Sequence, residues 1–113
     1  MNIAQTSFAE VTAQRLQALA ELYRLGQVSE VMDRTLEKLL AYEAELCQTQ
    51  LNQLQTDLAA FEQQYQLSSD EFYRRFQAGQ TDDSIDFVEW ASLVQMAHNL
   101  KQRLKLLTEA VKA

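Results

Sequence analysis

The 113-residue sequence contains no proline and only two glycines, Gly26 and Gly79. These two residue types are the ones that most often interrupt or end a helix. Because the sequence has so few points at which a helix must stop, we predict an all-α fold. The chain is long enough for one domain with a modest core, or for a small domain with an arm, but too short for an enzyme fold with a deep cleft.

Cysteine and histidine occur only once each, as Cys47 and His98. A single cysteine excludes an internal disulfide, and we interpret Cys47 as a small buried apolar side chain, the alternative being a reactive thiol. His98 lies off the apolar stripe of its segment, which favours an exposed residue over a metal ligand or a base. Gln95 stands three residues before His98, so the Glu-x-x-His motif of bundle metal sites is missing.

The sequence also lacks a glycine-rich phosphate loop, a nucleophile with a nearby base, and zinc-ligand spacing. Four acidic residues resemble the start of a calcium-binding loop: Asp82, Asp83, Asp86 and Glu89. Phe87 stands in place of the required glycine, however, and Leu93 in place of the closing Glu. We interpret the carboxylates as caps and as negative charge at the positive end of a helix. The sequence therefore predicts no enzyme activity, no metal and no cofactor.

Basic residues are in the minority, with 10 Lys and Arg against 16 Asp and Glu, giving a net charge of -6. Binding that relies on phosphate neutralisation needs Lys and Arg clustered on one face, so this composition suits a basic protein partner better. The first thirty residues lack the basic start and apolar run of a signal peptide, and no stretch approaches a membrane span. We therefore expect a cytoplasmic protein without membrane contact.

The first helical segment is predicted between Ser7 and Gly26. Ser7 and Glu10 form a capping box, in which each side chain satisfies a free backbone N–H group of the other. Gly26 ends the segment because it readily adopts a left-handed conformation. We define residues 1–28 as an N-terminal helix that, with the start of the next helix, forms an arm for dimerisation or DNA binding.

The second segment runs unbroken over residues 30–65 after an N-cap at Ser29, a span of roughly 54 Å at ~1.5 Å per residue. Its later apolar residues follow alternating steps of four and three, the spacing that keeps one stripe facing a partner helix. This stripe comprises Leu40, Ala44, Cys47, Leu51, Leu54, Leu58, Phe61 and Tyr65. Upstream, Met32, Leu36 and Leu39 follow a displaced stripe, so we expect different neighbours for the two halves.

The last segment carries a second stripe of the same spacing: Leu93, Ala97, Leu100, Leu104, Leu107 and Val111. Two stripes of similar length joined by a connector predict an antiparallel helical hairpin over residues 29–113. The connector covers residues 66–90. A two-helix hairpin leaves its other faces exposed and is marginally stable alone, so we expect a homodimer.

The connector contains a short helix, opened by a capping box at Ser68 and Glu71 and closed by Gly79. Two ion pairs one turn apart are expected: Asp70 with Arg74, and Glu71 with Arg75. The two arginines bind a phosphate or an acidic partner, or else form a solvated, ion-paired face. Five of the chain's ten aromatic residues also lie here: Phe72, Tyr73, Phe76, Phe87 and Trp90. We expect most of them to pack the connector onto the hairpin, and Tyr73 to be an exposed contact.

The stretch from Phe61 to Trp90 reads Phe-Glu-x-x-Tyr, then Ser-Ser-Asp-Glu-Phe-Tyr-Arg-Arg-Phe, Gly79, Asp82-Asp83 and Asp-Phe-x-Glu-Trp. This pattern resembles the helical antitoxin components of prokaryotic type II toxin-antitoxin modules. The resemblance implies a protein that neutralises a partner toxin by stoichiometric binding. We predict that the contact residues are Tyr73, Arg74, Arg75, Asp82, Asp83, Asp86 and Trp90.

Near the N-terminus, Leu16-x-x-Leu19-Ala20, Gly26 and Val28-Ser29-Glu30-Val31-Met32 resemble ribbon-helix-helix DNA-binding proteins. The resemblance implies a DNA phosphate contact at Ser29 and Glu30, and a strand over residues 6–11 that reads the major groove. The capping box favours a helix there instead. Autoregulatory DNA binding therefore stays open. The alternative to an antitoxin is a non-enzymatic helical scaffold or adaptor that forms a homo-oligomer.

Overall fold

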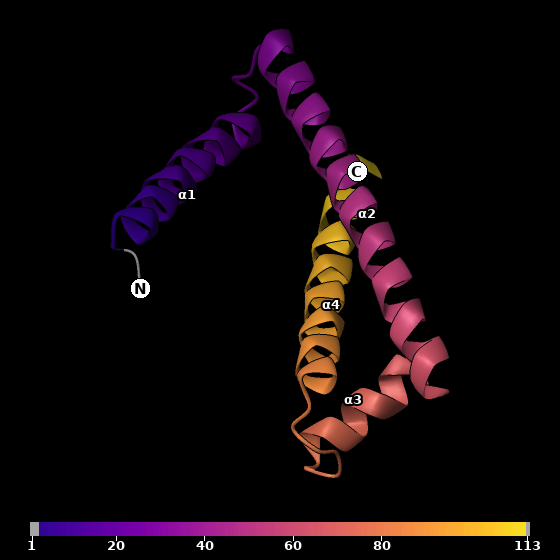
Figure 1. The fold of residues 1–113 in the computed structure, drawn as a ribbon. Helices are drawn as coiled ribbons and strands as arrows, with labels where there is room; N and C mark the ends of the chain where they lie inside the picture. Colours follow the sequence, from indigo (N-terminus) through magenta and orange to yellow (C-terminus); the bar gives the residue numbers. More distant parts are fainter. Residues whose placement is uncertain (1–2, 113) are drawn as a thin grey trace. The chain divides into compact units, whose positions relative to one another are not determined.

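The computed structural model describes the backbone of residues 3–112 and the side chains of residues 8–112. This part of the chain forms four α-helices: α1 (Ile3–Arg24), α2 (Glu30–Tyr65), α3 (Ser69–Gln77) and α4 (Ile85–Lys112) (Figure 1). The prediction of an all-α fold is confirmed. The chain divides into two compact units, Met1–Leu36 and Glu37–Ala113, and the boundary between them lies inside α2.

In the first unit, the turn between α1 and α2 follows the predicted glycine and serine signals. Gly26 adopts a left-handed conformation with φ of 71°, and the Gln27 N–H donates to the Leu22 carbonyl at 2.9 Å, which closes the end of α1. The Ser29 hydroxyl accepts a hydrogen bond from the Met32 N–H at 3.1 Å and so caps α2 as predicted.

The start of α1 differs from the prediction. The helix begins at Ile3, four residues before the expected N-cap at Ser7, whose side chain lies outside the described residues. Residues 6–11 are therefore helical and do not form the strand that the ribbon-helix-helix resemblance implies. The helix-favouring residues of this segment continue without proline or glycine, so nothing local stops the helix at Ser7.

In the second unit, α4 returns antiparallel alongside α2, and α3 lies at the turn (Figure 1). The two predicted stripes face each other. Leu51, Leu54 and Ala97 are buried between the helices, with Leu58, Leu93, Leu100 and Leu104 packed around them. Cys47 is only 2% exposed, as predicted, and its thiol donates a hydrogen bond to the Leu100 carbonyl at 3.3 Å. The predicted hairpin is therefore confirmed.

The two ends of α3 follow the predicted local signals, whereas the end of α2 just before it involves a feature that the sequence did not reveal. The Ser68 hydroxyl accepts a hydrogen bond from the Glu71 N–H at 3.2 Å, and Gly79 adopts φ of 72°. Before α3, however, α2 ends without a glycine. Gln66 instead takes a left-handed conformation with φ of 52°, and the Leu67 N–H donates to the Glu62 carbonyl at 3.3 Å. A non-glycine residue rarely occupies this region.

The aromatic residues of the connector form a second core centred on Trp90. The Phe72 ring stacks on the indole in parallel, with ring centres 3.8 Å apart, and Phe61 and Tyr65 stack against the indole at 5.5 and 5.7 Å. The indole N–H donates to the Ser69 hydroxyl at 3.0 Å. Since these residues come from α2, α3 and α4, the cluster holds all three helices together.

The prediction that Trp90 contacts a partner is wrong. Its side chain is 0% exposed, so no partner reaches it in this conformation. Trp90 is the largest fully buried side chain among the described residues, and burial of such a large apolar ring stabilises the fold. Trp90 therefore contributes to the folded core.

We predict that Ser69→Ala destabilises the protein by about 1–3 kcal/mol, because it leaves the buried indole N–H of Trp90 without an acceptor. Urea unfolding followed by circular dichroism measures the change. The control is Ser92→Ala on the exposed surface of α4, which we expect to stay within about 0.5 kcal/mol of the wild type. If both variants have the same free energy of unfolding, the result contradicts the structural role of this hydrogen bond.

Candidate functional site

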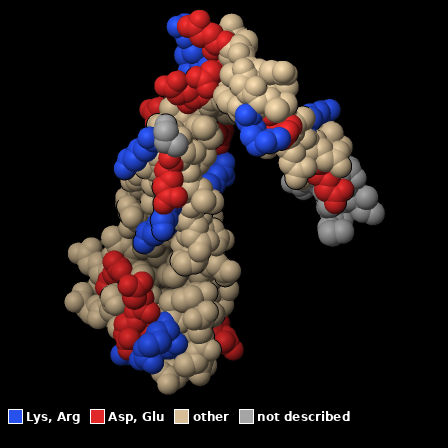
Figure 2. Space-filling view, turned by 180° about the vertical axis from the view of Figure 1, so that it is seen from behind, with Lys and Arg blue, Asp and Glu red and all other residues tan. Residues whose placement is uncertain are grey.

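The negative charge of the chain is concentrated where α2, α3 and α4 meet. We call residues 57–95 the acidic tip. The tip contains eight acidic residues: Asp57, Glu62, Asp70, Glu71, Asp82, Asp83, Asp86 and Glu89. Its only basic residues are Arg74 and Arg75, so its net charge of -6 equals that of the whole chain. In Figure 2, which views the molecule from behind, the end with α3 carries red patches beside a blue one.

The two arginines of the tip share one carboxylate. Arg74 contacts Glu71 at 2.6 Å and Arg75 contacts the same side chain at 3.0 Å. The predicted pair of Glu71 with Arg75 is confirmed, whereas Arg74 pairs with Glu71 and not with Asp70. The i,i+3 geometry lets two nitrogens of Arg74 reach both oxygens of Glu71. Both arginine side chains remain more than 40% exposed.

These hydrogen bonds lower the pKa of Glu71 to about 2 from its ordinary value of 4.5, with Arg74 contributing most and Arg75 next. The carboxylate is therefore ionised at every physiological pH. Because both guanidinium groups of the tip lie against this one acid, the remaining seven carboxylates of the tip have no ion-pair partner among the described residues.

The predicted acidic contact residues divide into two kinds. Asp82 accepts a hydrogen bond from the Ser84 N–H at 2.9 Å, and Asp86 accepts one from the Tyr65 hydroxyl. That bond is the main reason why the pKa of Tyr65 is raised above 10, with burial adding to it. These two acids thus stabilise the loop and the start of α4. Asp83 is exposed and forms no ion pair with any described residue, so it is the acid of this loop best placed to meet a partner.

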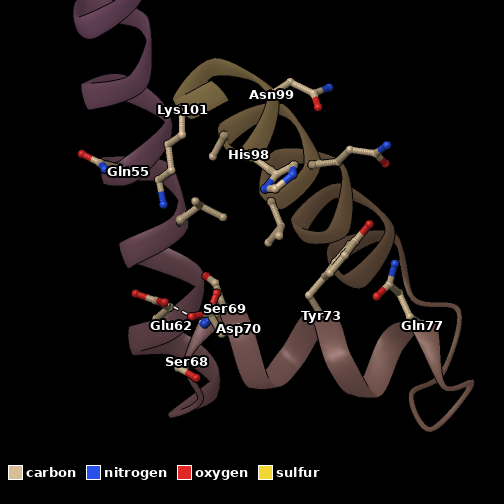
Figure 3. A pocket seen from close by; sticks show the side chains of 14 residues that line it. Gln55, Glu62, Ser68, Ser69, Asp70, Tyr73, Gln77, His98, Asn99 and Lys101 are labelled. Atoms are coloured by element: carbon tan, nitrogen blue, oxygen red, sulfur yellow. Dashed lines mark hydrogen bonds between the residues drawn. The ribbon is translucent and has the colours of Figure 1, made fainter. Parts of the chain in front are cut away.

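A groove lies between α2, α3 and α4 at the tip (Figure 3). Its volume is about 660 Å³, within the range of natural ligand sites. The apolar side of this tip groove consists of Leu58, Val94 and Ala97. Its polar lining includes Gln55, Glu62, Asp70, Tyr73, Gln77, His98 and Lys101. A second hollow of about 440 Å³ adjoins it and shares Tyr73, Gln77 and Gln95, so one recess continues between α3 and α4.

Tyr73 is the predicted contact residue that the structure places in this groove. It is half-buried and not fully exposed, because one side of its ring packs against the aromatic core. In Figure 3 its ring rises from α3 into the groove, toward α4. Tyr73 therefore links the folded core to the open recess.

The sequence did not reveal that His98 and Lys101 line the same groove. His98 is exposed, as predicted, but it lies across from Tyr73 (Figure 3). The available signal was spacing: Tyr73 and Gln77 are four residues apart on α3, and His98 and Lys101 are three apart on α4, so each pair shares one helix face. Which faces meet depends on the angle at which α3 packs, and local spacing does not determine it.

The remaining predicted residues lie in the first unit. The Ser29 hydroxyl is engaged in capping α2, and Glu30 forms an ion pair with Arg34. Among the described residues, no group of three or more His, Cys, Asp or Glu side chains is placed to hold a metal ion. Within residues 3–112, no helix combines the length and the apolar character that crossing a bilayer requires.

Comparison with protein-family models, with curated proteins and with solved structures found no match.

We predict that Glu71→Gln removes a stabilising contribution that depends on pH. Because the folded pKa is lowered, the contribution is complete above the ordinary value of 4.5 and is lost as the pH falls toward about 2. The urea midpoints of the wild type and the variant should therefore differ above pH 4.5 and converge between pH 4.5 and about 2.

Carboxyl-carbon NMR of the wild type should give a Glu71 titration midpoint near 2. The control is the double variant Arg74→Gln with Arg75→Gln, in which the midpoint should rise toward 4.5. A midpoint that does not move in the double variant contradicts the shared ion pair.

Proposed function

We propose that this protein is a non-enzymatic binding protein that neutralises a basic partner protein in a stoichiometric complex, as an antitoxin neutralises its toxin. The observation that carries the proposal is the coincidence of two features at one end of the hairpin. The acidic tip has seven carboxylates without an ion-pair partner among the described residues, and the tip groove opens between the same three helices.

The charge distribution supports a basic partner. Opposite charges across an interface speed the encounter between proteins and align them, while like charges suppress wrong partners. The net charge of -6 on the tip already includes its two arginines, and both of them contact the same acid, Glu71. A protein with a positive face is therefore attracted to this end of the molecule, whereas an acidic protein is repelled.

The groove supplies the apolar contact that charge alone does not provide. Interfaces depend on a few central residues in desolvated pockets, among which tyrosine and arginine are enriched. Tyr73 lies in the groove, and Arg74 follows it on α3 with 61% of its side chain exposed. Val88 is 50% exposed and lines the adjoining hollow. An apolar centre within an acidic surface is the arrangement expected of a protein-binding site.

We predict that the double variant Asp83→Lys with Glu89→Lys slows association with the partner about tenfold at low salt, and that added salt reduces the difference. The partner to use is the small protein encoded by the adjacent gene, coexpressed and purified with this chain. Surface plasmon resonance at several salt concentrations measures the rate. Glu45→Lys, which reverses the charge of an exposed acid on α2 outside the tip, is the control and should associate at close to the wild-type rate.

If both variants associate at the wild-type rate, charge at the tip does not guide the partner. If no basic protein copurifies and the chain is a stable oligomer by itself, the alternative function of a helical scaffold or adaptor replaces the proposal.

We also propose that two copies of the chain associate through α1. None of the described side chains of residues 8–36 is fully buried, and a two-helix unit of this size usually needs a partner for stability. Apolar side chains are exposed along α1 and just after it, with Phe8 at 71%, Val11 at 43% and Leu25 at 55%. Residues 1–36 contain four acidic and three basic side chains, so two copies meet there with little repulsion.

We predict that Phe8→Ser combined with Leu25→Ser converts a homodimer into a monomer, because the substitutions remove most of this exposed apolar area. Light scattering after size-exclusion chromatography measures the molar mass. Gln17→Ser, also exposed on α1, serves as the control and should remain dimeric. A wild-type chain that is monomeric at high concentration contradicts the proposed association.

A further inference from the structure

We infer that the tip groove receives one short amphipathic segment of the partner and fixes its direction, with a cationic side chain at the Asp70 end and a carboxylate at the Lys101 end. This inference rests on the proposed function and specifies the partner surface that it requires. It follows from three properties of the groove, which are the charges at its two ends and the apolar side between them.

The first end of the groove is acidic. Asp70 lies in the first turn of α3, and Glu62 reaches the same place from α2 (Figure 3). One oxygen of Glu62 accepts a hydrogen bond from the Ser69 N–H at 2.7 Å. Neither acid forms an ion pair with a described residue. Two carboxylates from two different helices therefore converge where a lysine or arginine of a partner would be paired.

The opposite end of the groove carries donors. Lys101 extends from α4 toward α2 near Gln55, and His98 lies one turn earlier on α4 (Figure 3). Lys101 forms no ion pair with any described residue. An ammonium group without a counterion among the described residues, close to the amide of Gln55, is suited to a carboxylate (Figure 3). A segment with the reverse charge order would meet like charges at both ends, so the groove selects one direction.

Between the two ends, Leu58, Val94 and Ala97 form an apolar side, and Tyr73 faces it from α3. The part of α4 from Val94 to Lys101 rises by about 10 Å, or two helical turns. A helix is about 10–12 Å across with its side chains, so a partner helix would lie over the groove and insert one row of side chains. Residues about seven apart on that helix would supply the cation and the carboxylate, with apolar residues between them.

The test measures the dissociation constant of the basic partner by calorimetry with the full chain. Asp70→Lys and Lys101→Glu should each weaken binding about tenfold or more, because each places a like charge against the segment. The matched controls are Glu45→Lys, an identical charge change outside both the tip and the groove, and Lys105→Glu, which is exposed on α4 and does not line the groove. Circular dichroism melting confirms that each variant folds.

The outcomes separate this inference from the proposed function. If the double variant Asp83→Lys with Glu89→Lys slows association while the two groove variants bind as tightly as the wild type, the partner binds the acidic tip without entering the groove, and the inference is overturned. If no basic protein binds the wild type, the proposed function fails, and a second probe still tests the groove.

That second probe is a phage-displayed library of random peptides of about 12 residues, long enough for two to three helical turns. The wild-type chain should enrich peptides that carry a cation, apolar residues and a carboxylate in one order. Lys101→Glu should lose that enrichment, whereas Lys105→Glu should keep it. Enrichment that is equal for Lys101→Glu and the wild type overturns the inference.

Discussion

The stack of rings around Trp90 is the interaction on which the rest of the structure depends. The indole packs against Phe61, Tyr65 and Phe72, and its N–H donates to Ser69 at the start of α3, so one side chain of α4 contacts both α2 and α3. Aromatic pairs contribute beyond their buried area. Because α3 has only nine residues and would not be stable alone, its position, and with it the tip groove, exists only while this stack is intact.

At the same end of the molecule, the buried residues stabilise the fold, and the exposed residues are the ones available for binding. Residues buried in the stack are apolar and inaccessible, while the acids on its surface remain solvated. Tyr73 belongs to both layers, since its ring packs against the core and also lines the groove. This arrangement places a rigid aromatic surface within a negative field, and a rigid site loses less entropy on binding than a flexible one.

The sequence predicted the elements well because their signals are local. Ser29, Ser68, Gly26 and Gly79 each act within one turn, and the two four-three stripes determine which faces of α2 and α4 meet. The sequence predicted the span of α2 over residues 30–65 correctly, but it did not predict that Gln66, a residue without special propensity, takes a left-handed conformation just after the helix. The sequence also did not predict the burial of Trp90 or the presence of the groove. Both depend on how α3 crosses the hairpin, which is a tertiary property.

Cys47 allows the opening of the hairpin to be measured by chemical labelling. Its thiol is almost fully covered and donates to the Leu100 carbonyl across the interface of α2 and α4. An alkylating reagent gains access only when the two helices separate, and the chain contains no other cysteine to compete for it. The rate of labelling at this one sulfur therefore reports how often the hairpin opens, and any ligand that holds α2 and α4 together slows it.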